Sequence, residues 1–244
     1  MPTAPTLVGA ATVTGSTAAI TTASITVQSG DVITVVAIGE GTNSGDSFSA
    51  PTTTLTTGTI TQLQLHAAAS NANAGAWTMT ATANGSGTVS SSYTPAAHNH
   101  VLAVYVHRGA TAATVARSAI AASSARTLSY TPSQADSAII WGVGDWAAAA
   151  VQTFTPTSTS HTSASPGPSA LPQSALVTSV YTEYNAVLDD QTGTGAVSYG
   201  IGGSGTGPFT IVIVEVQGTG GGATAGPRIY RQPTRVPNFR ASNF

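Results

Sequence analysis

Short apolar segments recur along the chain and predict β-strands. The segment 77–83 alternates strictly between apolar residues, beginning with Trp77 and Met79, and threonines, which is the pattern of a half-buried strand. Four longer apolar runs predict central strands buried on both faces: Val32 to Ile38, Val101 to Val106, Ala138 to Val143 and Thr210 to Val214. Weaker strand candidates are Ala19 to Val27, Ile60 to His66, Thr88 to Tyr93, Thr127 to Tyr130, Val151 to Thr155, Leu176 to Tyr184 and Ala196 to Ile201.

Helix signals are poor, because Thr, Ser and Gly are abundant and long-chain helix formers are scarce. About a dozen short strands separated by turn residues are typical of a sandwich or jelly roll. The sequence therefore predicts an all-β fold, a jelly-roll-like antiparallel β-sandwich over residues 1–218. Residues 157–172 consist almost entirely of Ser, Thr, Pro, Gly and Ala and predict a long surface loop.

Two segments of the chain resemble one another and suggest an internal duplication into halves 1–110 and 111–218. Ile25 to Ile33 resembles Leu128 to Ile139, since an Asp precedes an apolar strand in both. Val101 to Val106 likewise resembles Ile211 to Val216, and a glycine follows each. The alternative explanation is that any two segments rich in Thr and Val look alike. Both explanations stay open at this point.

The charge content is unusually low. Charged residues make up 7% of the chain, lysine is absent and the formal net charge is −2, whereas about 25% of residues are charged in a typical soluble domain. Hydrophobic residues make up 41%, so this is not the composition of a disordered chain. A surface with so few charges favours association. We therefore expect it to be covered by neighbours, including further copies of this chain.

Several classes of site and location are excluded by what the sequence lacks. Cysteine is absent, which excludes disulfides, zinc–thiolate sites and thiol nucleophiles. Residues 1–5 lack the features of a signal peptide, and no apolar run approaches the roughly 18 residues of a membrane-spanning helix. We expect a protein that is made in the host cytoplasm and does not insert into a membrane.

The composition changes near the end of the chain. Residues 219–226 are rich in glycine and predict a flexible linker. Residues 227–244 hold four of the seven arginines, three prolines and no acidic residue. The prolines favour an extended conformation, and Arg and aromatic residues are typical of interface cores. We expect a C-terminal arm that docks on a neighbouring subunit through Arg228, Tyr230, Arg231, Arg235, Phe239, Arg240 and Phe244.

The composition of this arm also fits two roles other than docking. A disordered basic tail is the usual fate of such a terminus. Nucleic-acid binding is a third interpretation, but four arginines on a slightly acidic chain make a small electrostatic footprint. Docking is the interpretation that we carry forward, and we expect no nucleic-acid partner.

Few residues are candidates for chemistry. His98 and His100 would share one face of an extended segment, as in the His-x-His metal sites of some phage fibres, although the start of a strand is the commoner explanation. Asp31 and Asp136 each precede a strand, where hydrogen bonding within a turn explains them better than catalysis. Asp189 and Asp190 lie in a predicted turn without the ligand spacing of a calcium loop.

Glu215 lies inside the last apolar strand, where it is either buried or at the exposed end of that strand. Nine acidic residues offer few candidates for the paired carboxylates of a glycosidase. The aromatic residues Trp141, Trp146, Tyr181 and Tyr184 would suit a sugar-stacking patch, but core packing is their commoner role. We therefore expect no catalytic residue, no metal ion and no cofactor.

Three segments carry a resemblance to a known family. Ile25 to Val36, Val101 to Gly109, and Gly195 to Ser198 leading to Phe209 to Gly218 resemble the β-sandwich repeat of minor tail proteins from actinobacterial phages. The likeness spans Ala19 to Gly218 and consists mainly of strand patterning and one Ser-Gly-Asp turn. Members often carry Gly-Trp after the second strand region, whereas this chain has Ala76-Trp77 much later. The resemblance implies a virion part that displays or attaches.

The leading hypothesis is a non-enzymatic bacteriophage structural protein, specifically a minor tail protein. It would assemble with other virion proteins, and with itself, through the sandwich and the arm. The alternatives are a capsid decoration or cement protein, and a carbohydrate-binding module for a host surface glycan. A polysaccharide-degrading enzyme on a β scaffold is a further, weaker hypothesis.

Overall fold

The computed structural model describes residues 5–39, 46–66, 73–94, 100–121, 127–130, 133, 137–145, 181–187, 197–200 and 209–219. For residues 112–121, 127, 129, 143–145, 181–187, 197–200 and 209 the backbone pairing alone is described. Every regular element in these ranges is a β-strand, and the strands pair in antiparallel fashion. The predicted all-β antiparallel sandwich is confirmed.

A five-stranded sheet forms the middle of the molecule. Its order is β1 (Thr6–Gly15), β11 (His100–Arg108), β4 (Val32–Gly39), β8 (Asn73–Thr80) and β7 (Thr61–His66). Every residue of β4 is buried, and in β11 only Arg108 is exposed. Other strands cover both faces of this central sheet, which is why the apolar runs within β4 and β11 do not alternate. The prediction that these runs are central strands is confirmed.

Small sheets cover one face of the central sheet. One has the order β2 (Ala19–Thr21), β10 (Val89–Thr94) and β5 (Ser47–Phe48), and β6 (Thr52–Thr53) also pairs with β10. Another pairs β3 (Ile25–Val27) with β9 (Gly85–Gly87). Val35, Trp77 and Leu102 of the central sheet share one apolar cluster with Ile20 and Phe48 of the small sheets. This cluster is the first of two cores.

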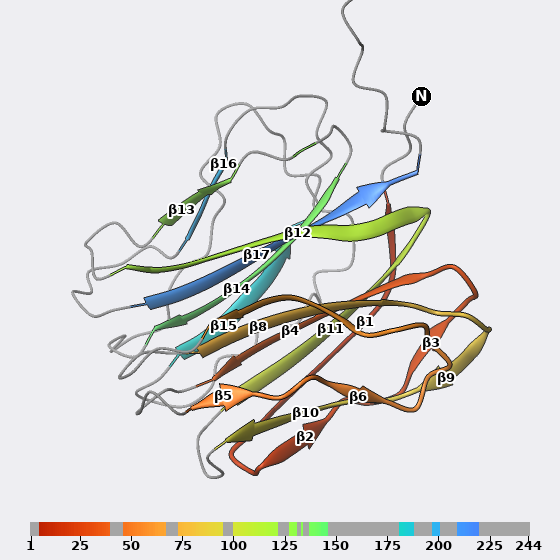
Figure 1. Ribbon diagram of the computed structural model, residues 1–244, viewed down its shortest axis with the longest axis horizontal. Helices are drawn as coiled ribbons and strands as arrows, with labels where there is room; N and C mark the ends of the chain where they lie inside the picture. Colours follow the sequence, from red (N-terminus) through yellow and green to blue (C-terminus); the bar gives the residue numbers. More distant parts are fainter. Residues whose placement is uncertain are drawn as a thin grey trace, which may run out of the picture.

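The opposite face of the central sheet is covered by a four-stranded sheet. Its order is β12 (Ala110–Ala121), β17 (Phe209–Gly218), β14 (Ala138–Asp145) and β15 (Tyr181–Val187). Val36 and Ala103 of the central sheet join Ile140, Val212 and Val214 of the covering sheet in the second apolar core. Outside it, β13 (Thr127–Tyr130) pairs with β16 (Val197–Gly200). Figure 1 shows the sheets as successive layers, from β2 and β10 to β13 and β16.

The two halves of the chain share one strand order. In the central sheet, β1, β11, β4 and β8 are neighbours in that order, and β12, β17, β14 and β15 follow the same order in the covering sheet. The β3–β9 pair likewise corresponds to the β13–β16 pair. Such correspondence accords with the duplication hypothesis, which stays a prediction, because similar topology alone does not establish common origin.

A single residue joins the halves. β11 ends at Arg108 and β12 begins at Ala110, although the two strands belong to different sheets. Gly109 lies between them with a φ of 71°, which L-residues with a side chain seldom adopt. The amide of Thr219 donates a 2.8 Å hydrogen bond to the Gly109 carbonyl. The end of β17 is therefore held against the point where the chain changes sheet.

The structure corrects several predicted strands. The single strand predicted over residues 19–27 is wrong, because β2 and β3 belong to different sheets. Buried Thr22 separates them, and its side-chain oxygen accepts a hydrogen bond of 3.1 Å from the Val89 amide. β8 begins before the predicted Trp77 and ends at Thr80 rather than Ala83. The long strands β1 and β12 were not predicted at all. The strand candidate at 151–155 and the surface loop predicted at 157–172 lie outside the described residues.

Candidate functional site

The residues predicted to bind a partner lie outside the described part of the chain. These are Arg228, Tyr230, Arg231, Arg235, Phe239, Arg240 and Phe244. The predicted linker, apart from Thr219, is outside it as well. Docking by the C-terminal arm therefore stays a prediction, and the sites described below all belong to the sandwich.

The most extensive polar cluster surrounds Glu215 on β17. Glu215 is fully buried, so the alternative of an exposed strand end is wrong. The Tyr130 hydroxyl donates to its Oε2 at 2.5 Å, and the Ser137 hydroxyl donates to its Oε1 at 2.6 Å. Ser133 donates its amide at 2.9 Å and its hydroxyl at 3.0 Å. The Gln217 side chain in turn donates to the Ser133 hydroxyl oxygen at 2.6 Å.

This arrangement suits a structural role better than a catalytic one. The donors from Tyr130, Ser133 and Ser137 occupy lone pairs on both carboxylate oxygens, and the side chain has no exposed surface. A general base or nucleophile needs an open lone pair within reach of its substrate. Glu215 instead ties β13 and the segment before β14 to the outer side of the covering sheet.

The second polar site is the pair formed by Asp31 and Arg108. Asp31 ends the turn before β4 and accepts a 2.7 Å hydrogen bond at Oδ2 from the Gln28 amide. Arg108 donates from Nε to Oδ1 at 2.9 Å and from Nη2 to Oδ2 at 3.0 Å, in a bidentate geometry. Gly30, with a φ of 91°, makes this turn possible. The prediction that Asp31 serves a turn is confirmed, whereas Asp136 lies outside the described residues.

The environment of Asp31 acts on its pKa in two directions. Burial raises the pKa of Asp31, but hydrogen bonds from Arg108 and from the Gln28 amide, together with the positive charge of Arg108, outweigh burial and leave the pKa below its usual value. The same contact raises the pKa of Arg108. Asp31 is therefore ionised at neutral pH and neutralised by one partner. Sequence reasoning missed Arg108, although it is the single arginine in residues 1–110 and the chain has no lysine.

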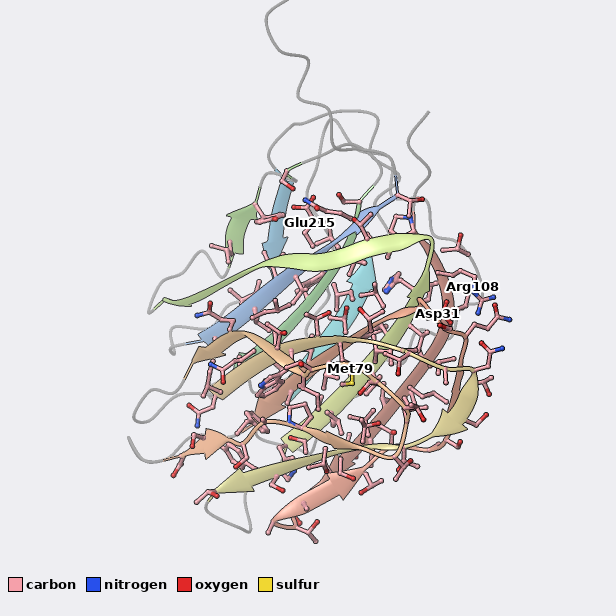
Figure 2. The ribbon with its side chains drawn as sticks, turned by 45° about the vertical axis from the view of Figure 1, so that its right-hand side comes forward. Asp31, Met79, Arg108 and Glu215 are labelled. Atoms are coloured by element: carbon pink, nitrogen blue, oxygen red, sulfur yellow. The ribbon has the colours of Figure 1, made fainter. Side chains whose placement is uncertain are left out.

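These two polar sites occupy related positions in the halves. Asp31 joins the turn between β3 and β4 to the end of β11, while Glu215 joins the segment between β13 and β14 to β17. The carboxyl group of Asp31 is on the turn, whereas that of Glu215 is on the strand. Figure 2 shows Asp31 and Arg108 beside each other at one side of the molecule and Glu215 apart from them.

Two histidines lie in the core on β11. His100 is fully buried, with ring centroids 5.4 Å from Tyr93 and 6.0 Å from Phe48. It begins β11, so the interpretation of His100 as the start of a strand is confirmed; His98 and Asn99 lie outside the described residues. Within those residues, no three His, Cys, Asp or Glu side chains form a group that suits a metal ion.

His107 lies further along the same strand and is 1% exposed. Neither ring nitrogen has a hydrogen-bond partner among the described residues. Burial lowers the pKa of His107 to about 4, because a charged imidazolium is costly in an apolar interior. His107 is therefore neutral at physiological pH.

The sugar-stacking hypothesis loses its central residue. Trp141 on β14 is fully buried, so it forms no exposed platform, and the core-packing interpretation is confirmed for it. Tyr181 and Tyr184 lie on β15, with backbones opposite Asp145 and Gly142. Their side chains, and the whole of Trp146, Asp189 and Asp190, lie outside the described residues.

No protein-family model, curated protein or solved structure matches this chain. In the described ranges, no helix has the length and apolarity needed to cross a lipid bilayer. What the sandwich does must therefore be argued from its own surface.

That surface is almost free of charge over the described residues between 5 and 111. Among the described residues from 5 to 111, Asp31 and Asp46 are buried, and Arg108 is the one charged side chain that is exposed. It is already paired with Asp31. The remaining exposed positions are mostly Thr, Ser, Ala, Gln and Gly.

Proposed function

We propose that this chain is a non-enzymatic structural protein of a bacteriophage virion, a minor tail protein that assembles through protein–protein contacts. The observation that supports the proposal is the nearly uncharged surface of the described residues between 5 and 111, on which Arg108 is the one exposed charge. Surfaces of soluble monomers usually contain roughly 25–35% charged residues. A surface with one exposed and already paired charge is suited to burial against other proteins.

Removing water from charged and polar groups is the main energetic cost that this surface avoids when a partner covers it. Covering an ion costs free energy unless a partner neutralises it, and imperfectly paired polar groups weaken association. Many exposed hydroxyls here already bond to one another or to the backbone: Thr21 Oγ1 lies 2.7 Å from Ser90 Oγ, and Thr26 Oγ1 lies 2.9 Å from Ser86 Oγ. A partner that covers such a surface removes water from one ion at most, Arg108, which Asp31 already neutralises, and it leaves these hydroxyl groups with partners.

The choice of a phage tail rests on the resemblance of Ile25 to Val36 and Val101 to Gly109 to the minor tail repeat. These segments form β3, β4 and β11 together with the Asp31 turn. A capsid decoration protein would need the same nearly uncharged surface. The position of the protein within the particle therefore distinguishes a tail protein from a decoration protein. The glycan-binding alternative is not favoured, because Trp141 is buried.

Incorporation into particles tests the proposal. Peptide mass spectrometry and electron microscopy of purified virions should find the complete chain at a fixed copy number in the tail. Absence from purified virions would overturn the proposed function, and detection on the capsid shell would replace the tail by capsid decoration. The non-enzymatic part of the proposal is tested separately: the purified chain, incubated with polysaccharide substrates, should not degrade them.

A truncation separates the arm from the sandwich. A variant that lacks residues 227–244 should fold normally, because none of the contacts described above involves those residues, yet it should be lost from particles. The matched control is a Thr80→Ala variant, which changes an exposed position on the sandwich and should be incorporated as the complete chain is. Normal incorporation of the truncated chain would remove the docking role of the arm.

A further inference from the structure

Strand β1 forms a long and unprotected edge of the central sheet. It pairs with β11 along its whole length, from Thr6 opposite Arg108 to Gly15 opposite His100. Among the described residues no other strand pairs with it. Its ten residues therefore present a row of backbone N–H and C=O groups over roughly 30 Å.

Most of β1 lacks the usual devices that protect sheet edges. Proteins protect exposed edges with charged side chains, prolines, bulges or very short strands. β1 contains no charged residue and no proline, and its one irregularity lies between Leu7 and Gly9. The following seven residues, Gly9–Gly15, pair with β11 without interruption.

The other long edges in the described ranges differ from β1. β12 contains Arg117 and has two irregularities, and β15 contains Glu183. β7 has six residues and an irregularity between Gln62 and Gln64. The edge formed by β1 is therefore the one on which neither charge nor shortness opposes the addition of another strand.

The side chains of β1 suit a second copy of the same strand. Ala11 and Val13 contact the first apolar core, while Ala10 and Thr14 are exposed on the other side. An antiparallel pair of β1 strands about a two-fold axis would bring the Ala11 and Val13 sides of both copies together. It would therefore extend the core across the junction, with hydroxyl and methyl groups facing on the opposite side.

Charge matters for self-pairing, because a two-fold axis places the same strand, with the same charges, on both sides of the junction. Like charges directly opposite are destabilising in a sheet. Since β1 is neutral throughout and Arg108 beside its first residue is paired with Asp31, the strand is electrostatically compatible with itself.

We propose that a second copy of this chain docks on β1 by antiparallel strand pairing, so that the two central sheets become one ten-stranded sheet. This inference rests on the proposed assembly function and names the contact that joins two copies. It is independent of the C-terminal arm, which would connect the protein to other subunits.

Sedimentation velocity of the complete chain over a range of concentrations tests the proposal. The unmodified chain should form a dimer. Ala10→Lys places a charge on an exposed position of the edge, and it should weaken the dimer at least tenfold. Thr80→Lys is the matched control, since it adds the same charge at an exposed position of β8, inside the same sheet, and it should leave the dimer intact.

Hydrogen exchange gives a measurement that needs no variant. Dilution through the dimer dissociation range should accelerate exchange in Thr6–Gly15 and leave the buried strand Val32–Gly39 unchanged. A chain that is monomeric at all concentrations, or a dimer that survives Ala10→Lys with unchanged protection of β1, would overturn the inference. Incorporation into particles tests the proposed virion function separately. A chain that is monomeric in solution but enters virions would overturn the β1 contact and leave the proposed function standing.

Discussion

The Tyr130 hydroxyl donates a 2.5 Å hydrogen bond to Oε2 of Glu215, although the two residues are 85 positions apart in the chain. The contact joins β13, in the outermost layer, to β17 in the sheet beneath it. Because Glu215 is fully buried, its carboxyl oxygens accept hydrogen bonds from protein donors rather than from water. The outer layer is thus attached to the sandwich by a carboxylate.

Tyr130→Phe should therefore lower the free energy of unfolding by about 2 kcal/mol, since removing a donor from a buried acceptor costs roughly 1–3 kcal/mol. Tyr93→Phe is the control, because the Tyr93 hydroxyl accepts a hydrogen bond from the neutral Asn73 amide and should cost only about 1 kcal/mol. Urea denaturation of both variants measures the difference. An equal or smaller loss for Tyr130→Phe would contradict the role assigned to Glu215.

His107 should make the protein sensitive to mild acid. Its pKa is lowered from 6.5 to about 4 by burial, so the unfolded chain takes up a proton at a higher pH than the folded chain does. Stability should then be unaffected above pH 6.5 and should fall by about 3 kcal/mol as the pH drops from 6.5 to 4. His107→Leu should flatten this part of the curve. Parallel pH profiles for the two proteins would refute the assignment.

Asp31→Asn should destabilise the protein modestly at neutral pH, because the amide cannot replace the ionised partner of Arg108. The pKa of Asp31 is lowered in the folded state, so the stabilisation is present above the unfolded value of 3.8 and is lost as the pH falls through the folded value. The loss should be smaller than that of Tyr130→Phe, since the Arg108 side chain is 44% exposed to solvent. Denaturation curves should converge in acid, and a constant gap at all pH values would count against the ion pair.

Gly142→Ala should disturb the contact between the central and covering sheets. A Cβ atom on Gly142 would lie 3.0 Å from Val36 Cγ1 and from Ile38 Cδ1, and overpacking of this kind costs about 1–3 kcal/mol. Gly85→Ala is the control, because a Cβ there would meet nothing within 4 Å, and its effect should stay within about 0.5 kcal/mol. Equal thermal stability of the two variants would argue against the close packing of β14 on β4.

The central strands were predictable because their sequences are apolar at consecutive positions. Val32 to Ile38 and Val101 to Val106 contain enough β-branched residues to indicate burial on both faces, and the structure confirms it. The turn role of Asp31 was also predictable, since Ser-Gly-Asp before an apolar run is a local signal. The low charge of the surface follows directly from the composition, and the interpretation that neighbours cover it remains a prediction.

The edge strands β1 and β12 were not predictable, because Ala in both and Gly in β1 are frequent and these two residue types are depleted in strands. They are strands because the apolar strands β11 and β17 offer them a complete row of backbone hydrogen bonds. In the same way, the sequence from Ala19 to Val27 does not show that its two ends form strands of different sheets, β2 and β3.

What the sequence by itself determined is the set of strands whose own side chains require burial, together with a chain poor in charge. The tertiary structure decided which strands meet, and thereby that Glu215 is buried among hydroxyl donors, that Trp141 belongs to the core and that β1 is left at an edge. The physical reason is separation along the chain. The burial preference of a strand follows from residues adjacent in sequence, whereas Tyr130 and Glu215 come into contact only when strands distant in sequence pack together.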